Sequence, residues 1–337
     1  MEEQQENQNA QHEQDSFMEN KLDVSLVQNT TYAIKQEIGK VVVGQNKMLD
    51  LLIIALLTNG HVLIEGVPGI AKTLTAKLLA KVIDLDFSRI QFTPDLMPTD
   101  VLGTSVFNLK NSDFTFNKGP IFSNLILIDE INRAPAKTQA ALFEVMEEKQ
   151  ATIDGTTYPM ALPFFVMATQ NPIEQEGTYK LPEAQLDRFL FRIKIDYPSV
   201  EEEVQILNRF KSSFDHTKTI NVDKKVSAKD IQNCLETIEQ VHIKDELIKY
   251  IAEIIDNTRN NGDLTLGASP RASLAILKCA KAQAAINGRD FVTPDDIQAV
   301  AFPVLNHRII LNPDKEIEGT KEEEIIQEII EKIEVPR

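Results

Sequence analysis

Short runs of consecutive apolar residues alternate with amphipathic stretches over the first 200 positions of the chain. Three of these runs, residues 61–65, 125–128 and 164–168, predict strands buried on both faces of a parallel sheet. The amphipathic stretches repeat their apolar residues at helical spacing. They predict helices over residues 22–39, 46–58 and 72–83. Strands that alternate with helices in this way predict an α/β sheet with right-handed crossovers.

Two further stretches alternate apolar and polar residues around turn-forming sequences, which is the pattern of a β-hairpin. One covers residues 105–116 and turns at 110–113; the other covers residues 151–160 and turns at Asp154 and Gly155. They lie just before and just after the apolar run at 125–128. This position favours two hairpin insertions in the α/β unit over ordinary meander strands.

The sequence after Tyr197 has helical periodicity only, which predicts a small helical domain. Helices are expected to begin at Ser227, at Pro270 after Ser269, and at Pro294 after Thr293, with another over residues 243–259. A last helix over residues 320–333 is predicted from a capping box of Thr320 and Glu323 and from a stripe of isoleucines. The expected division is a disordered tail at 1–21, an αβα core at 22–200, a linker at 201–226, a helical lid at 227–312 and a C-terminal helix at 313–337.

Composition narrows the class of protein. The chain is 42% hydrophobic, so it can bury a core, but no apolar run approaches the ~18–20 residues that cross a bilayer. The first 20 residues are rich in Gln and acidic residues, which predicts a disordered tail and no secretory signal. Cys234 and Cys279 stand apart, so we expect reduced packing residues and a cytoplasmic protein. The net charge of −16 argues against a duplex-DNA partner.

Residues 66–73 read Gly-Val-Pro-Gly-Ile-Ala-Lys-Thr and stand between a predicted strand and a predicted helix. In this context backbone N–H groups wrap phosphates, the Lys72 ammonium reaches the outer phosphates, and the Thr73 hydroxyl ligates Mg²⁺. Ala71 replaces the second glycine of the standard pattern, which a negative φ would permit. The predicted fold is therefore a P-loop NTPase αβα sandwich with hairpin insertions and an all-α lid. The predicted cradle for ATP consists of Gly66, Val67, Pro68, Gly69, Ile70, Ala71, Lys72, Thr73 and Leu74.

Two acidic residues follow the apolar run at 125–128. Asp129 and Glu130 would stand at the carboxyl end of that strand, where open α/β sheets bind ligands. We expect Asp129 to hold Mg²⁺ together with Thr73, and Glu130 to polarise the attacking water. An Asp-Glu pair alone is common. This interpretation depends on the position of the pair, which follows the phosphate loop in the chain and stands at the end of an apolar strand.

Three polar residues further along complete the predicted catalytic set. Asn171 follows the strand at 164–168, and a neighbouring strand would bring its amide near the γ-phosphate and the water. Arg188 precedes the end of the sheet domain, and Arg271 begins a helix of the lid. Phosphoryl transfer calls for guanidinium groups on the transition-state charge, supplied by the same subunit or by a neighbour.

These motifs together resemble AAA+ ATPases, and among them the MoxR family. The residues that carry the resemblance are 66–73, Asp-Glu-Ile-Asn-Arg-Ala at 129–134, Ala-Thr-Gln-Asn-Pro at 168–172, Leu-Pro-Glu-Ala-Gln-Leu-Asp-Arg-Phe at 181–189 and Ser-Pro-Arg at 269–271. The family pattern tends to carry alanine where Ala71 stands. The resemblance covers residues 41–303 and leaves out the tail and the last helix.

The resemblance implies the roles of individual residues: a Walker A loop at 66–73, Walker B at Asp129 and Glu130, sensor 1 at Asn171, an arginine finger at Arg188 and sensor 2 at Arg271. Val43, Gly44 and Gln45 would lie against the adenine, and Arg133 would face the neighbouring subunit. The resemblance also implies a hexameric ring that remodels protein partners, often proteins with a von Willebrand factor A domain.

Other functions stay open at this point. A magnesium-chelatase-type ATPase subunit shares these motifs. A nucleic-acid motor is disfavoured by the acidic balance and by the hairpin tips at residues 111–113 and 154–156, which carry no Lys or Arg to contact phosphates. A scaffold that binds ATP without hydrolysis is disfavoured because it has no need of Glu130, Asn171 and Arg188.

Overall fold

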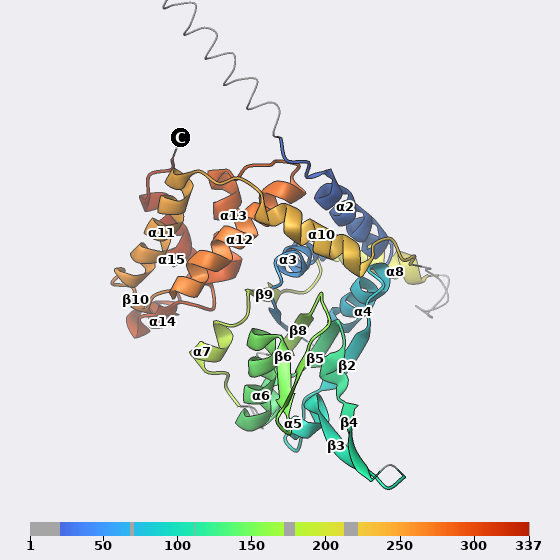
Figure 1. The fold of residues 1–337 in the computed structure, drawn as a ribbon. Helices are drawn as coiled ribbons and strands as arrows, with labels where there is room; N and C mark the ends of the chain where they lie inside the picture. The colour runs from blue at the N-terminus through green and yellow to red at the C-terminus, as the bar shows by residue number, and fades with distance from the viewer. Residues whose placement is uncertain (1–20, 68–70, 111, 172–178, 212–221, 337) are drawn as a thin grey trace, which may run out of the picture.

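The computed structural model describes residues 21–67, 71–110, 112–171, 179–211 and 222–336. Its centre is a five-stranded sheet in which all neighbouring strands are parallel (Figure 1). The strand order is β2-β5-β8-β1-β9. The bounds are β1 (Val62–Gly66), β2 (Phe87–Gln91), β5 (Leu125–Asp129), β8 (Phe165–Gln170) and β9 (Phe191–Ile195). The three predicted strands are confirmed and form the interior of the sheet, and β2 and β9, which the apolar runs did not reveal, form its two edges.

The sheet is buried on both faces, as its continuous apolar strands predict. In β5, Leu125 and Leu127 belong to one hydrophobic cluster, whereas Ile126 and Ile128 belong to the other. Successive side chains of a strand point to opposite faces, so each cluster occupies one side of the sheet. The first cluster includes α4 (Lys72–Val82), and the second includes α6 (Ala136–Glu148) and α5 (Pro98–Leu102). The predicted αβα sandwich is therefore confirmed.

Both predicted hairpins are present as separate antiparallel pairs outside the main sheet. The first pairs β3 (Gly103–Asn108) with β4 (Asp113–Lys118), and the second pairs β6 (Gln150–Ile153) with β7 (Thr156–Pro159). The second turns at Asp154 and Gly155, which both have positive φ, as a tight hairpin turn requires. Figure 1 shows that β3 and β4 extend away from the body of the molecule.

Helices dominate the chain after β9. The described helices after β9 are α8 (Val200–Phe210), α10 (Ala228–Glu239), α11 (Asp245–Arg259), α12 (Pro270–Ile286), α13 (Pro294–Leu305), α14 (Pro313–Glu318) and α15 (Glu322–Lys332). The short helix α7 (Glu183–Leu186) precedes β9. The predicted caps at Ser227 and Thr293 are present, and Pro270 and Pro294 occupy the first turns of their helices. The lid also contains a short antiparallel pair, β10 (Leu264–Leu266) with β11 (Ile310–Leu311), which the expectation of an all-helical lid did not include.

The start of the last helix was predicted wrongly. Its N-cap is Lys321, without a side-chain capping bond, so Thr320 and Glu323 form no capping box. The isoleucine stripe was predicted correctly, because Ile325, Ile326, Ile329 and Ile330 are all buried. The helix lies against α11 and α13.

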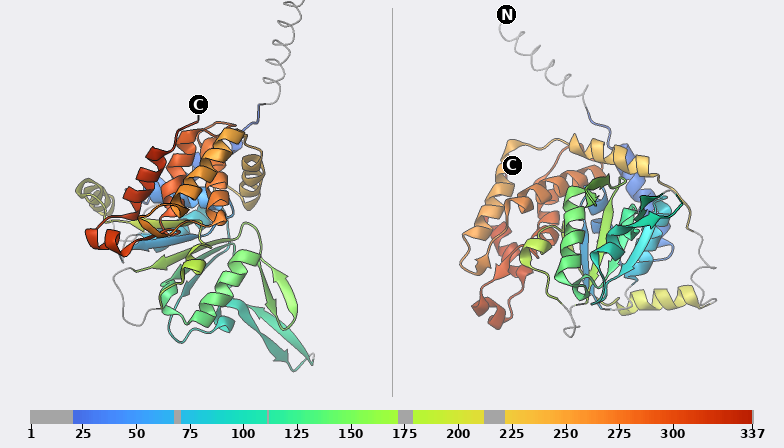
Figure 2. Two further views of the ribbon diagram at one scale, coloured as in Figure 1. Left: turned by 90° about the vertical axis from the view of Figure 1, so that its left-hand side faces the viewer. Right: turned by 60° about the horizontal axis from the view of Figure 1, so that its bottom comes forward.

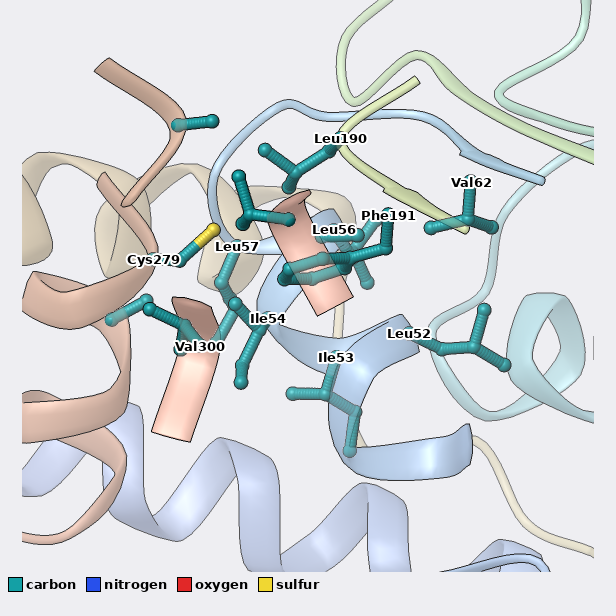
Figure 3. Close-up of a cluster of buried hydrophobic side chains, with 14 of the residues drawn as sticks. Leu52, Ile53, Ile54, Leu56, Leu57, Val62, Leu190, Phe191, Cys279 and Val300 are labelled. Atoms are coloured by element: carbon teal, nitrogen blue, oxygen red, sulfur yellow. The ribbon is translucent and has the colours of Figure 1, made fainter. Parts of the chain in front are cut away.

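The helical lid is joined to the sheet by continuous packing. The helices α2 (Ser25–Gly39) and α3 (Asn46–Leu56) share one hydrophobic cluster with β9 and with the lid. Figure 3 shows Leu57 and Phe191 beside Cys279 of α12 and Val300 of α13. Figure 2 shows from two other sides that the lid helices lie directly against the sheet domain. Within the described ranges, no helix is long and apolar enough to cross a membrane.

Candidate active site

The predicted phosphate loop connects β1 to α4. Gly66 is the last residue of β1, and Lys72 is the first residue of α4. A Cβ on Gly66 would come within 2.9 Å of the Ile195 carbonyl oxygen, so this position needs a glycine to lie against β9. Val67 and Leu74 pack against the main hydrophobic cluster. Pro68, Gly69 and Ile70, also predicted cradle residues, lie outside the described residues, as does most of the predicted tail.

Ala71 has an unexpected backbone conformation. Its φ is +43°, in the left-handed region, although the sequence interpretation assumed a negative value. This conformation costs a residue with a Cβ about 1–2 kcal/mol, which explains why the standard pattern has glycine there. The structure thus holds Ala71 under strain directly before Lys72, and functional loops are where such strain collects.

Lys72 lies close to both predicted acidic residues. Its ammonium donates a hydrogen bond to the Gly66 carbonyl, at an Nζ–O distance of 2.7 Å. Burial lowers the pKa of Lys72, and the negative charges of Asp129 and Glu130 oppose that shift. The structure therefore brings the ammonium and the two carboxylates into one site, with half-buried Thr73 beside Lys72.

Asp129 and Glu130 follow one another at the carboxyl end of β5 and are held by different partners. Asp129 accepts hydrogen bonds from Arg89 Nε at 2.6 Å and from Thr169 Oγ1 at 3.3 Å. Glu130 accepts from Gln91 Nε2 at 2.7 Å, and its φ of +59° turns the chain sharply out of the strand. Both carboxylates are thus fixed by neighbouring strands.

Sequence reasoning missed the contribution of β2. Arg89 and Gln91 lie on this edge strand and contact Asp129 and Glu130. These two residues could be assigned to the site only once β2 was known to pair with β5, and the sequence alone does not show that pairing. Arg133, which the family resemblance places toward a neighbouring subunit, forms an ion pair with Glu130 of its own chain at 3.1 Å.

Asn171 comes directly after β8 and is buried. Because β8 lies between β5 and β1, its carboxyl end stands between Asp129 and the start of the phosphate loop. Glu65 pairs with Gln170, so the residues that follow them, Gly66 and Asn171, leave this strand pair side by side. The predicted position of Asn171 among the other site residues therefore agrees with the strand order.

A large cavity lies beside the cradle, between the sheet and the lid. It has a volume of about 750 Å³, which is in the range of small-ligand sites. Its wall includes Gly44, Gln45, Ile195, Tyr197, Phe302 and Pro303. Ile195 pairs with Gly66, so this wall of the cavity lies beside the last residue of β1. Val43, also predicted to lie against adenine, is buried in the protein.

Arg188 and Arg271 lie together at the amino ends of the strands, which we call the amino edge of the sheet. Lys72 and Asp129 lie at the opposite ends, the carboxyl edge. Arg188 comes just before Phe191, which pairs with Val62 at the amino end of β1, whereas Lys72 follows the carboxyl end. β1 and β9, which separate the two arginines from Lys72, are about 15 Å long. The two arginines bind the same carboxylate: Glu147 Oε2 lies 2.6 Å from Arg188, and Oε1 lies 2.5 Å from Arg271.

The residues at the carboxyl edge fit a magnesium–nucleotide group. Lys72 supplies a cation that interacts with the charges of Asp129 and Glu130, and Thr73 and Asp129 supply the hydroxyl and carboxylate oxygens that Mg²⁺ prefers. The cavity beside Gly44 has room for the base and sugar. The fold and this donor set define a P-loop ATPase with a helical lid.

Comparison with known proteins agrees with this class. Residues 61–191 match the ATPase family associated with various cellular activities (AAA), and residues 256–329 match the AAA lid domain. The chain is 46% identical to the uncharacterized protein YeaC of Bacillus subtilis, over 89% of this chain and 93% of that protein. It is 43% identical to the chaperone MoxR1 of Mycobacterium tuberculosis, over 89% and 81%.

A solved structure gives the same result. A protein of Cytophaga hutchinsonii described as a candidate ATPase superimposes with a TM-score of 0.86 and 46% identity, over 93% of this chain and 97% of that one. The chain therefore belongs to the MoxR family of AAA+ ATPases.

Proposed function

We propose that this chain hydrolyses ATP, with Mg²⁺, at sites shared between neighbouring copies in a closed ring of six. In each site one subunit supplies the cradle of Lys72 and Thr73, and its Asp129 holds the metal with Thr73. Mg²⁺ neutralises charge on the phosphates when it is bound. Glu130 accepts a proton from the attacking water, and Asn171 orients that water.

The observation that carries this proposal is the position of the two arginines. Arg188 and Arg271 share Glu147 at the amino edge of the sheet, whereas Lys72 and Asp129 lie at the carboxyl edge. A subunit cannot bring these edges together without breaking β1 and β9. A head-to-tail interface in a ring places the amino edge of one subunit against the carboxyl edge of the next. The arginines would then stabilise charge at the neighbour's nucleotide.

The partners that we propose are proteins. The hairpin of β3 and β4 exposes Phe107, Leu109 and Phe114, which suit apolar protein segments and make no contact with phosphates. The name of the chaperone MoxR1 supports a chaperone-like role. We propose that hydrolysis moves this hairpin against client proteins, with von Willebrand factor A domains among the candidate clients.

Substitution of Glu130 by Gln tests the chemistry. Loss of the base without loss of the cradle should lower hydrolysis by about 10²–10⁴-fold. The affinity for ATP, measured by titration calorimetry, should stay within about threefold of the unchanged protein. Glu246→Gln, at an exposed carboxylate of α11, is the matched control and should hydrolyse ATP normally. Hydrolysis by Glu130→Gln at a rate near normal would show that another residue activates the water.

A further inference from the structure

The lid holds a buried cation against the segment that carries Arg188. The side chain of Arg308, which follows α13, is only 3% exposed. Its guanidinium donates to Asp187 Oδ1 at 2.7 Å and to the backbone carbonyls of Asp187, Phe189 and Leu190 at 3.1, 2.6 and 3.1 Å. One side chain of the lid therefore fixes most of the backbone of residues 187–190.

The two residues before Arg308 bind the same stretch of chain. His307 Nε2 lies 2.9 Å from the Phe189 carbonyl oxygen, and the Asn306 amide donates to the Arg192 carbonyl at 3.0 Å. Burial is the main cause that lowers the pKa of His307, whose Nε2 faces the Phe189 carbonyl and whose Nδ1 faces Asn306 Oδ1 at 3.1 Å. Three consecutive lid residues thus hold the chain from Asp187 to Arg192.

Asp187 connects this contact to the helix that carries Arg271. Its Oδ1 pairs with Arg308, and its Oδ2 accepts from Ser269 Oγ at 3.0 Å and lies 3.8 Å from Arg271 Nη1. Arg271 and Arg188 in turn share Glu147. The segment that carries Arg188 and the side chain of Arg271 are therefore connected through one partly buried carboxylate.

The geometry points to Arg308 as a positioning residue for the hydrolytic site of the neighbouring subunit. It fixes the 187–190 segment to the lid, so that Arg188 and Arg271 reach the neighbour's nucleotide as one rigid pair. The inference rests on the proposed function. A buried ion pair stabilises a fold poorly compared with apolar packing, but a guanidinium with five donors defines the position of several carbonyls at once. A lysine at this position keeps the positive charge but lacks the planar guanidinium that donates to several carbonyls at once.

The test uses the full chain with Arg308→Lys and a matched control, Arg289→Lys. Arg289 is a second lid arginine that binds Asp296 through two nitrogens, both at 2.6 Å, and has no contact with the 187–190 segment among the described interactions. Arg308→Lys should lower kcat by about 10–100-fold, since a shift of about 1 Å in a reacting group has that effect. The KM for ATP should change by less than about threefold, because the subunit's own cradle is intact. Arg289→Lys should retain normal kcat.

Mixed assemblies separate positioning from a general structural defect. Arg308→Lys subunits mixed equally with Lys72→Ala subunits should regain up to about a quarter of normal activity, since about one interface in four then pairs an intact cradle with an intact arginine pair. A mixture of Arg308→Lys with Arg188→Ala subunits should regain no ATPase activity. Both variants have a defective arginine pair, so neither can supply an intact one to its neighbour. If Arg308→Lys does not fold, Ser269→Ala, which removes one bond to Asp187, takes its place in both mixtures.

Normal kcat in Arg308→Lys would overturn the inference. So would a low kcat that Lys72→Ala subunits fail to rescue, provided that a mixture of Arg188→Ala with Lys72→Ala is rescued in parallel. If that parallel mixture stays inactive although the subunits co-assemble, the shared site itself is wrong, and both proposals fall together.

Discussion

Lys72 donates a hydrogen bond to the carbonyl of Gly66, six residues earlier, across the turn of the phosphate loop. The bond joins the first residue of α4 to the last residue of β1 and holds the ammonium near Asp129 and Glu130. Because a charged group can exchange this carbonyl for phosphate oxygens, which accept stronger bonds, the same side chain is placed to bind nucleotide.

Substitution of Lys72 by Ala should abolish ATP binding, because it removes the main side-chain contact to the outer phosphates. Titration calorimetry should detect no heat of binding at ATP concentrations that saturate the unchanged protein. Lys77→Ala is the matched control, since Lys77 lies on the exposed side of the same helix, and its affinity should be normal. Near-normal affinity in Lys72→Ala would contradict the site assignment.

Gly44 tests the base-binding side of the site. It has a φ of +77°, which strains any residue with a Cβ, and a Cβ there would come within 2.4–2.7 Å of the Glu202 carboxylate group beside it on the cavity wall. Gly44→Ala should therefore move the cavity wall and weaken ATP binding by at least about tenfold, or about 1.4 kcal/mol. Gly39→Ala is the control, because a Cβ at Gly39 meets no atom within 4 Å. Equal affinities in the two variants would place the base elsewhere.

His61 makes the stability of the fold depend on pH. Val166 N–H donates to Nδ1, so the neutral ring carries its proton on Nε2 and donates it to the Met146 carbonyl. Burial lowers the pKa of His61 to about 4. A histidine with a lowered pKa contributes stability above its unfolded value near 6.5, and this contribution is lost as the pH falls toward 4.

The free energy of unfolding should therefore fall by about 2 kcal/mol through His61 between pH 7 and pH 5. Urea unfolding at both pH values, compared between the unchanged protein and His61→Gln, measures this contribution, because all other groups titrate in both proteins. The pH dependence of the variant should be weaker by this amount. Identical pH dependence in the two proteins would show that His61 does not titrate with the fold.

Much of this fold could be predicted from the sequence because its interior strands are continuous apolar runs. β5 and β8 are buried on both faces, and no other local structure suits such short runs between turns. The edge strands were missed for opposite reasons. β2, which reads Phe-Ser-Arg-Ile-Gln, carries the polar contacts of the site and lacks an apolar pattern. β9, which reads Phe-Arg-Ile-Lys-Ile, alternates clearly, and this pattern was open to recognition.

The candidate residues at the carboxyl ends of the strands, Lys72, Asp129 and Asn171, could be proposed from the sequence because their motifs follow strands of a parallel sheet. The sequence does not show which residues far apart in the chain contact one another in the fold. Glu147 joins Arg188 to Arg271, and Arg308 reaches back to Asp187 from the far end of the lid. A lone Glu or Arg in a helical pattern has the signature of a solvated surface residue. Only the packing of the lid against the sheet shows that these side chains meet.

The most direct test of the shared site is complementation between two inactive variants. Arg188→Ala subunits keep the cradle, and Lys72→Ala subunits keep the arginines. Each variant alone should hydrolyse ATP about 10³-fold or more slowly than the unchanged protein. Mixed in equal amounts, with co-assembly shown by capture of an untagged variant on a tagged one, they should regain up to about a quarter of normal activity. An inactive mixture of subunits that demonstrably co-assemble would show that Arg188 does not act on a neighbour's nucleotide.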